Sequence, residues 1–146
     1  MKIASISENQ KIEKRIAITP EIAKKYISLG FEILLSENYG SHLGIEDEEY
    51  KELGVLTSND EKEIIINSDI VIQLGLLSNN KNSLLRENQT FIGVLNPYDN
   101  KDIIDNLVKK NINTFSLELL PRITRAQSMD ILSSQANLAG YKAVVE

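Results

Sequence analysis

The fold is decided by the stretch Asp69-Ile70-Val71-Ile72-Gln73-Leu74, an almost continuous apolar run between two polar segments. A strand of this kind suits burial on both faces, which is the environment of a central strand in a parallel sheet. Residues 90–95 repeat the pattern, and residues 2–6 and 31–35 carry the same β-branched and aromatic side chains. We therefore predict that these segments are strands of one mostly parallel sheet.

Segments with the 3.6-residue period of helices separate the strands. Thr19 supplies a capping hydroxyl, Pro20 suits the first helical position, and Gly30 ends this helix. The alternation predicts an α/β fold, with a mainly parallel twisted sheet of five or six strands and helices on both faces in a flavodoxin-like or Rossmann-like three-layer arrangement. Further helices are expected at 46–53, 58–67, 100–110 and from about 128 to the last residue, and further strands after Gly54 and at 114–117.

Apolar positions within two of these helices indicate what they pack against. In the 100–110 helix, the positions expected to face the sheet are Ile103, Ile104, Leu107 and Val108. In the last helix, small residues at 136, 139, 140 and 143 form one side, which we expect to be covered.

Composition excludes several classes of function. The chain has 146 residues, 42% hydrophobic and 25% charged, which indicates one globular domain with a core. Its net charge of −5 argues against nucleic-acid binding, and no apolar stretch reaches the roughly 20 residues of a membrane span. There is no cysteine and His42 is the single histidine, so no metal site is predicted; the lack of cysteine also fits a reducing cytoplasm.

The most unusual stretch is residues 119–137, which is rich in side chains that both donate and accept hydrogen bonds. On a helix, its polar residues would form one stripe, preceded on the loop by Arg122. A solvated helix face is one interpretation of this stripe. Short hydroxyls and amides in place of Lys and Glu favour the other, which is a site of directional hydrogen bonding. The stripe consists of Gln127, Asp130, Ser134 and Asn137, flanked by Ser133.

The position of this stretch favours a ligand site, since open α/β sheets bind ligands on loops at the carboxyl ends of their strands. An amide such as the nicotinamide carboxamide would match its donors and acceptors. Arg15 is a weaker candidate for clamping a carboxylate. Residues 40–44 contain two glycines but lack the spacing of a dinucleotide loop, and no Gly-x-Gly-x-x-Gly occurs anywhere in the chain.

The chain resembles the family that joins alanine dehydrogenase, saccharopine dehydrogenase and the transhydrogenase alpha subunit. The similarity runs through residues 13–21, 29–33 and 68–71 and ends on Pro121-Arg122-Ile123-Thr124-Arg125-Ala126-Gln127-Ser128-Met129-Asp130, followed by residues 132–141. This last run is similar to the transhydrogenase branch. There, the matching residues contact the nicotinamide end of NAD(H), which implies cofactor contacts from Arg122, Thr124, Gln127, Ser128, Asp130 and Ser133, with a catalytic role for Gln127.

The resemblance also implies the rest of the machinery. Residues 1–146 would be the N-terminal domain of the NAD(H)-binding component of a proton-translocating NAD(P) transhydrogenase. A Rossmann domain would follow it, a partner component would bind NADP(H), and membrane components would couple hydride transfer to proton movement. The full subunit would be a cytoplasmic homodimer, peripheral to the inner membrane. The last helix shows no stop signal, from which we expect the native polypeptide to continue.

Two other functions stay open at this point. An alanine dehydrogenase needs an arginine, a lysine and a histidine around its substrate, and only Arg15 matches, because Gln73 stands where related chains commonly carry lysine. The other alternative is a stand-alone, non-catalytic module that binds a partner protein.

Overall fold

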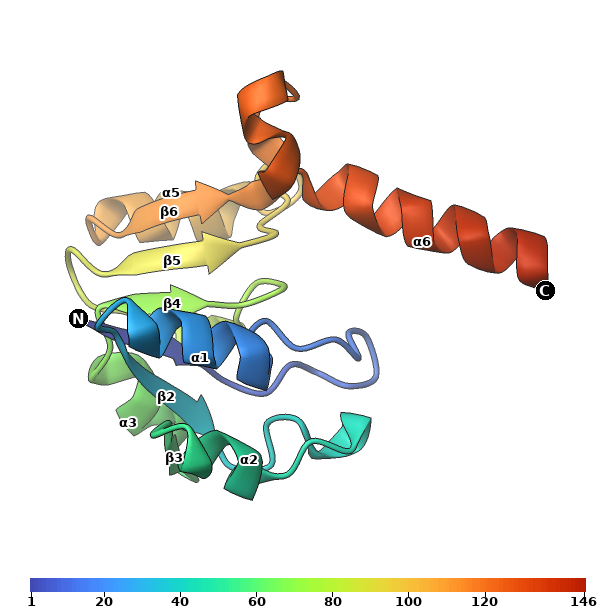
Figure 1. Cartoon of the computed structure of the whole chain (residues 1–146). Helices are drawn as coiled ribbons and strands as arrows, with labels where there is room; N and C mark the ends of the chain where they lie inside the picture. The colour runs from blue at the N-terminus through green and yellow to red at the C-terminus, as the bar shows by residue number, and fades with distance from the viewer.

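Six parallel strands form a single sheet in the order β3-β2-β1-β4-β5-β6 in the computed structural model, which describes residues 1–146. The prediction of a mainly parallel sheet of five or six strands is confirmed, and β4, from the stretch at 69–74, is one of the two central strands (Figure 1). The strands are β1 (Lys2–Ser5), β2 (Glu32–Ser36), β3 (Leu56–Ser58), β4 (Ile70–Ile72), β5 (Thr90–Gly93) and β6 (Asn113–Ser116).

Helices cover both faces of the sheet, as predicted. In Figure 1, α1 and α2 lie in front of the strands, and α3 and α5 lie behind them. The α-helices are α1 (Pro20–Ser28), α2 (Asp47–Glu52), α3 (Glu61–Ile66), α4 (Asn79–Asn82), α5 (Lys101–Lys109) and α6 (Ile131–Val145), and the 3-10 helices are η1 (Ser41–Leu43), η2 (Leu117–Leu119) and η3 (Thr124–Met129).

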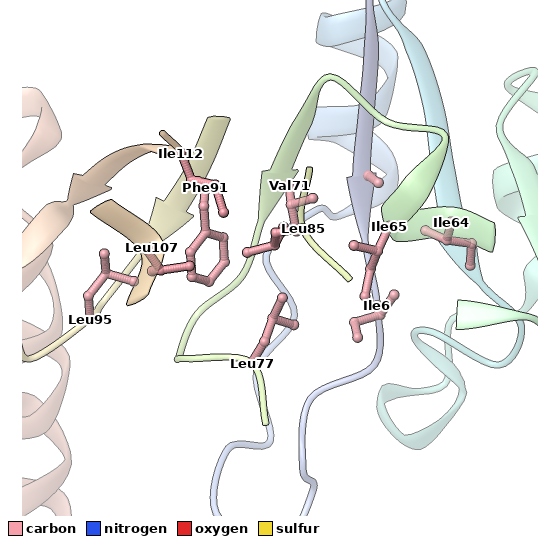
Figure 2. Close-up of a cluster of buried hydrophobic side chains, with 11 residues drawn as sticks. Ile6, Ile64, Ile65, Val71, Leu77, Leu85, Phe91, Leu95, Leu107 and Ile112 are labelled. Carbon is pink, nitrogen blue, oxygen red and sulfur yellow. The ribbon is translucent and has the colours of Figure 1, made fainter. Parts of the chain in front are cut away.

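Alternation along the strands produces two cores, one for each face. Ile3 of β1 belongs to the cluster beneath α1 and α2, whereas its neighbour Ala4 belongs to the cluster beneath α3 and α5. Figure 2 shows the second cluster, in which Phe91 of β5 lies beside Leu107 of α5. Full burial of such a side chain stabilises the fold by about 1.5–3 kcal/mol relative to exposure. The two cores together hold the sheet rigid beneath its loops.

The order of the strands reverses between β1 and β4. The chain first builds outward from β1 to β3, then crosses back and continues on the other side of β1 through β4 to β6. The connections that leave β1 and β4 therefore run in opposite directions and open a crevice at the carboxyl edge of the sheet. We call this the switch crevice and define it by residues 6–13 and 73–81, which line it.

Three local expectations were wrong or incomplete. Val108 was expected to face the sheet, but its side chain is 61% exposed, because it lies about 100° around the helix from the buried Leu107, at the margin of the packed stripe. The short helix α4 lies in a segment for which no element was predicted. The last helix begins at Ile131 and not near Ser128, because the chain first forms the 3-10 helix η3.

Helix α6 extends away from the body of the domain, as the red ribbon of Figure 1 shows. None of its residues is buried, so the expectation that its small apolar side is covered is wrong for this chain. Its exposed apolar residues include Leu138, Tyr141 and Val144. The helix has no long apolar span either, and no helix of the structure has the length and hydrophobicity needed to cross a membrane.

Candidate functional site

The stretch singled out in the sequence connects β6 to α6. It leaves the carboxyl end of β6, forms η2, turns at Pro121 and forms η3 before α6 begins. Because all six strands are parallel, their carboxyl ends meet at one edge, and this stretch lies at that edge (Figure 1). This is the region where open α/β sheets place their ligands.

Asp130 lies at the junction of η3 and α6 and caps the helix. Its Oδ1 accepts hydrogen bonds from the main-chain nitrogens of Leu132 and Ser133, each at 3.0 Å, and its Oδ2 accepts one from the Ser133 hydroxyl at 2.6 Å. The Ser133 hydroxyl, with main-chain donors and the charge of Arg122, lowers the pKa of Asp130 below its ordinary value. The carboxylate is therefore ionised at neutral pH and holds the orientation of Ser133.

A shallow hollow of about 360 Å³ lies along the start of α6. We call it the α6 hollow. It brings together four of the predicted site residues, Gln127, Ser128, Asp130 and Ser133, and adds Met129, Ile131, Ser134 and Asn137. The predicted stripe thus shares one surface, although Gln127 reaches it from η3 and not from the helix.

Two of the predicted residues lie outside this hollow. Arg122 and Thr124 are exposed and do not line it, although the charge of Arg122 acts on Asp130. The hollow is open on one side, and its lining residues are exposed or half-buried. A ligand here would therefore be enclosed only if another surface covered it, since ligand sites usually bury most of the ligand.

A second polar cluster lies in the switch crevice and centres on Gln73, which is 3% exposed. Its Oε1 accepts from the Ser5 hydroxyl and from the main-chain nitrogen of Ile6, both at 2.9 Å. Its Nε2 donates to the Ile6 carbonyl at 3.2 Å and to Glu8 Oε1 at 3.3 Å. All four hydrogen-bonding positions of the amide are used, so Gln73 ties the end of β4 to the end of β1.

Glu8 forms the solvent side of this cluster. Its Oε1 accepts from the main-chain nitrogen of Leu74 at 2.6 Å as well as from Gln73. Burial raises the pKa of Glu8, and the nearby charge of Glu13 adds to the effect, while main-chain donors and Lys81 oppose it. Sequence reasoning noted Gln73 as a departure but missed Glu8; a polar residue ending a buried strand was the signal for this cluster.

The weaker sequence candidates have structural roles. The Arg15 guanidinium donates to Glu13 from Nε at 2.9 Å and from Nη2 at 2.6 Å, so it is already paired within its own loop. The ring of His42 is exposed and bonds to Gln10 and to the main chain of Lys14. No cluster of metal-binding side chains occurs in the structure. These contacts leave the switch crevice without a free cation to hold a carboxylate substrate.

An open parallel sheet with polar loops at its carboxyl edge defines the class as a ligand-binding α/β domain. Comparison with known proteins narrows this class. The family described as "Alanine dehydrogenase/PNT, N-terminal domain" matches residues 5–139. The chain belongs to this family, as the sequence resemblance indicated.

Individual relatives agree with the family. Two of them are the first of the parts into which NAD(P) transhydrogenase subunit alpha is divided. The chain is 42% identical to the one from Rickettsia prowazekii and 36% identical to the one from Rhodospirillum rubrum, in each case over 100% of this chain and 39% of the relative. The crystal structure of transhydrogenase from Sinorhizobium meliloti superposes with a TM-score of 0.89 and 38% identity, covering 98% of this chain and 43% of that one. The chain thus spans about two-fifths of these relatives and belongs to an oxidoreductase family.

Proposed function

We propose that this chain is the N-terminal domain of the NAD(H)-binding component of a proton-translocating NAD(P) transhydrogenase, and that it contacts the nicotinamide end of the cofactor. The observation that carries the proposal is the α6 hollow, where Gln127, Ser128, Asp130 and Ser133 meet after the last strand. Family membership supports the same assignment, because the relatives bear the name of a transhydrogenase subunit.

The residues of the hollow fit a carboxamide. The amide of Gln127 both donates and accepts, the Ser128 hydroxyl does the same, and the ionised Asp130 retains acceptor capacity beyond its three intramolecular bonds. Arg122 adds a charged donor at the entrance to this stretch. When bound, nicotinamide supplies the carbon that gives or takes the hydride. The task of this chain is to orient that ring, and we assign Gln127 the part closest to the reaction.

The surroundings of the hollow agree with a domain that works in an assembly. The hollow is open on one side, and α6 presents uncovered apolar residues. We propose that a Rossmann domain of the same subunit closes the site and binds the adenosine and pyrophosphate, since this chain has no glycine-rich phosphate loop. A partner component would carry NADP(H), membrane components would translocate protons, and the complete subunit would be a homodimer on the cytoplasmic side of the inner membrane.

Alanine dehydrogenase chemistry is disfavoured by the switch crevice. An amide occupies the place of the lysine and is fully bonded within the protein, and Arg15 is paired with Glu13. A non-catalytic module is the remaining alternative, and the following experiment separates it from the enzyme.

The test uses the complete subunit, reconstituted with its NADP(H)-binding partner. Asp130→Asn keeps a helix-capping side chain but removes the charge, and Gln127→Ala removes the amide. We expect unchanged melting temperatures. The Asp130→Asn variant should bind NADH several-fold to about a hundredfold more weakly, as for a lost charged hydrogen bond. The Gln127→Ala variant should transfer hydride on the order of a hundredfold more slowly, because a misplacement of about 1 Å has that effect.

Lys142→Ala provides a matched control on the same helix, since Lys142 is exposed and lies outside the hollow. It should bind NADH and transfer hydride like the wild-type subunit. Normal affinity and normal transfer in both site variants would return the stripe to a solvated helix face and favour the non-catalytic module. A fall in melting temperature in the site variants would assign these residues to folding.

A further inference from the structure

Glu118, in η2, makes an unusual contact across the carboxyl edge of the sheet. Its carboxylate accepts a hydrogen bond from the main-chain nitrogen of Leu95, at 3.0 Å from Oε1 and 3.3 Å from Oε2, and a short one from that of Asn96 to Oε1. Both donors belong to the connection between β5 and α5. The carboxylate therefore joins the connection after β5 to the connection after β6.

The backbone around Asn96 is shaped for this contact. Asn96 has a φ of +44°, in the left-handed region that asparagine tolerates better than most residues. A residue in this conformation lets successive N–H groups converge on one anion. On the other side of the same turn, the Asn100 side chain donates to the carbonyls of Leu95 and Asn96, both at 3.1 Å. The turn thus has two anchors, and only Glu118 leads toward the candidate site.

Residues 117–146 have few other attachments to the domain. Apart from the Glu118 contacts, no side-chain hydrogen bond and no ion pair joins them to residues 1–116. Ala126 is their single buried residue, at 5% exposure. Helix α6 contacts η2, the turn that carries Glu118. The placement of η3 and of the α6 hollow relative to the sheet therefore depends strongly on this one side chain.

We propose that Glu118 is a positioning residue for the candidate nicotinamide site, acting through its hold on the turn at 95–96. The inference rests on the proposed function and deepens it. Glu118 does not line the hollow, so its effect reaches the cofactor through the position of Arg122, Gln127 and Asp130. Its removal would let that stretch shift relative to the sheet, and a shift of about 1 Å between reacting groups costs on the order of a hundredfold in rate.

Three variants of the complete subunit test the proposal, again with the NADP(H)-binding partner. Glu118→Ala removes both hydrogen bonds. Glu118→Gln retains an Oε1 acceptor, on which both main-chain nitrogens converge, and should restore the contact. Asn100→Ala loosens the same turn without touching residues 117–130, and is the matched control.

Glu118→Ala should lower the hydride transfer rate by about tenfold to a hundredfold at saturating NADH, with a smaller change in KM for NADH. Amide hydrogen exchange should become faster at Leu95, Asn96 and residues 120–130. Glu118→Gln should recover most of the rate and the slow exchange, and Asn100→Ala should keep the rate. A purely structural role would lower the melting temperature equally in Glu118→Ala and Asn100→Ala and leave the ratio of their transfer rates unchanged.

Wild-type transfer and exchange in Glu118→Ala would overturn the proposal, and so would an equal loss of rate in Asn100→Ala. Failure of the proposed function gives a different result. In that case Gln127→Ala and Asp130→Asn would show normal NADH binding and transfer, while the exchange measurement would still report whether Glu118 holds residues 120–130 in place.

Discussion

Replacement of Gln73 by leucine should destabilise the domain strongly, because the loss falls on main-chain groups inside the protein. The Gln73→Leu variant removes the hydrogen bonds to the nitrogen and the carbonyl of Ile6, which have no other hydrogen-bond partners. Ser5 loses one bond but keeps the one to Tyr39, at 2.8 Å. A buried group left without a partner costs about 1–3 kcal/mol, and the added apolar side chain recovers part of that, which gives a net loss of about 3 kcal/mol.

Thermal unfolding followed by circular dichroism measures this effect. For a chain near 150 residues, 1 kcal/mol corresponds to about 2–4 °C, so the melting temperature should fall by about 10 °C. Gln73→Glu is the matched variant. It keeps the acceptor but places a carboxylate where the Gln73 amide now lies 3.3 Å from Glu8. Two carboxyl groups so close share a proton, which raises their pKa values, so this variant should regain stability as the pH falls.

A melting temperature within about 2 °C of wild type for Gln73→Leu would refute this reasoning, since it would mean that the ends of β1 and β4 hold together without the amide. Stability of Gln73→Glu that does not change between acidic and neutral pH would contradict the close contact with Glu8.

Two further predictions concern neighbouring positions. Burial raises the pKa of Glu8 above its ordinary value of 4.5, so the stabilising effect of its protonation is complete below that value and is lost as the pH rises through the folded-state pKa. Urea unfolding at a series of pH values should show this loss in the wild type and not in Glu8→Gln; parallel pH profiles would contradict it. Gly93→Ala should destabilise by about 1–3 kcal/mol, since its Cβ would lie 2.8 Å from the main-chain oxygen of Gln73. Gly140→Ala, with nothing within 4 Å, should stabilise by about 0.5–1 kcal/mol in the same assay; the opposite order of the two would be inconsistent with this packing.

Much of the fold could be predicted because its signals are local. The apolar run at 69–74 indicated a central strand, and Thr19 with Pro20 indicated the start of α1, where the Thr19 hydroxyl accepts from Ile22. The nearby polar residues of the candidate site were also named in advance, and four of them line the α6 hollow. Their roles with NAD(H) stay a prediction.

Other features were missed because they depend on a local competition that periodicity does not report. Asp130 takes an extended conformation and caps α6, which ends the 3-10 turn before it and moves the helix start to Ile131. Val108 is apolar and falls near the expected face, but packing of α5 centres on Leu107 and leaves Val108 exposed. In both places, hydrogen bonding or packing decided between conformations with similar sequence patterns.

The sequence by itself determined the class of this protein: the apolar runs, their spacing and the helix caps specify parallel strands joined by helices, because each depends on residues a few positions apart. Only the tertiary structure decided which distant residues meet. Gln73 bonds to residues 65 to 68 positions away, and Glu118 reaches across 22 and 23 positions to the turn after β5. Such partners become neighbours only when the strands are ordered in the sheet, since a polar side chain bonds to whatever folding brings within its reach and not to a partner marked in its own segment.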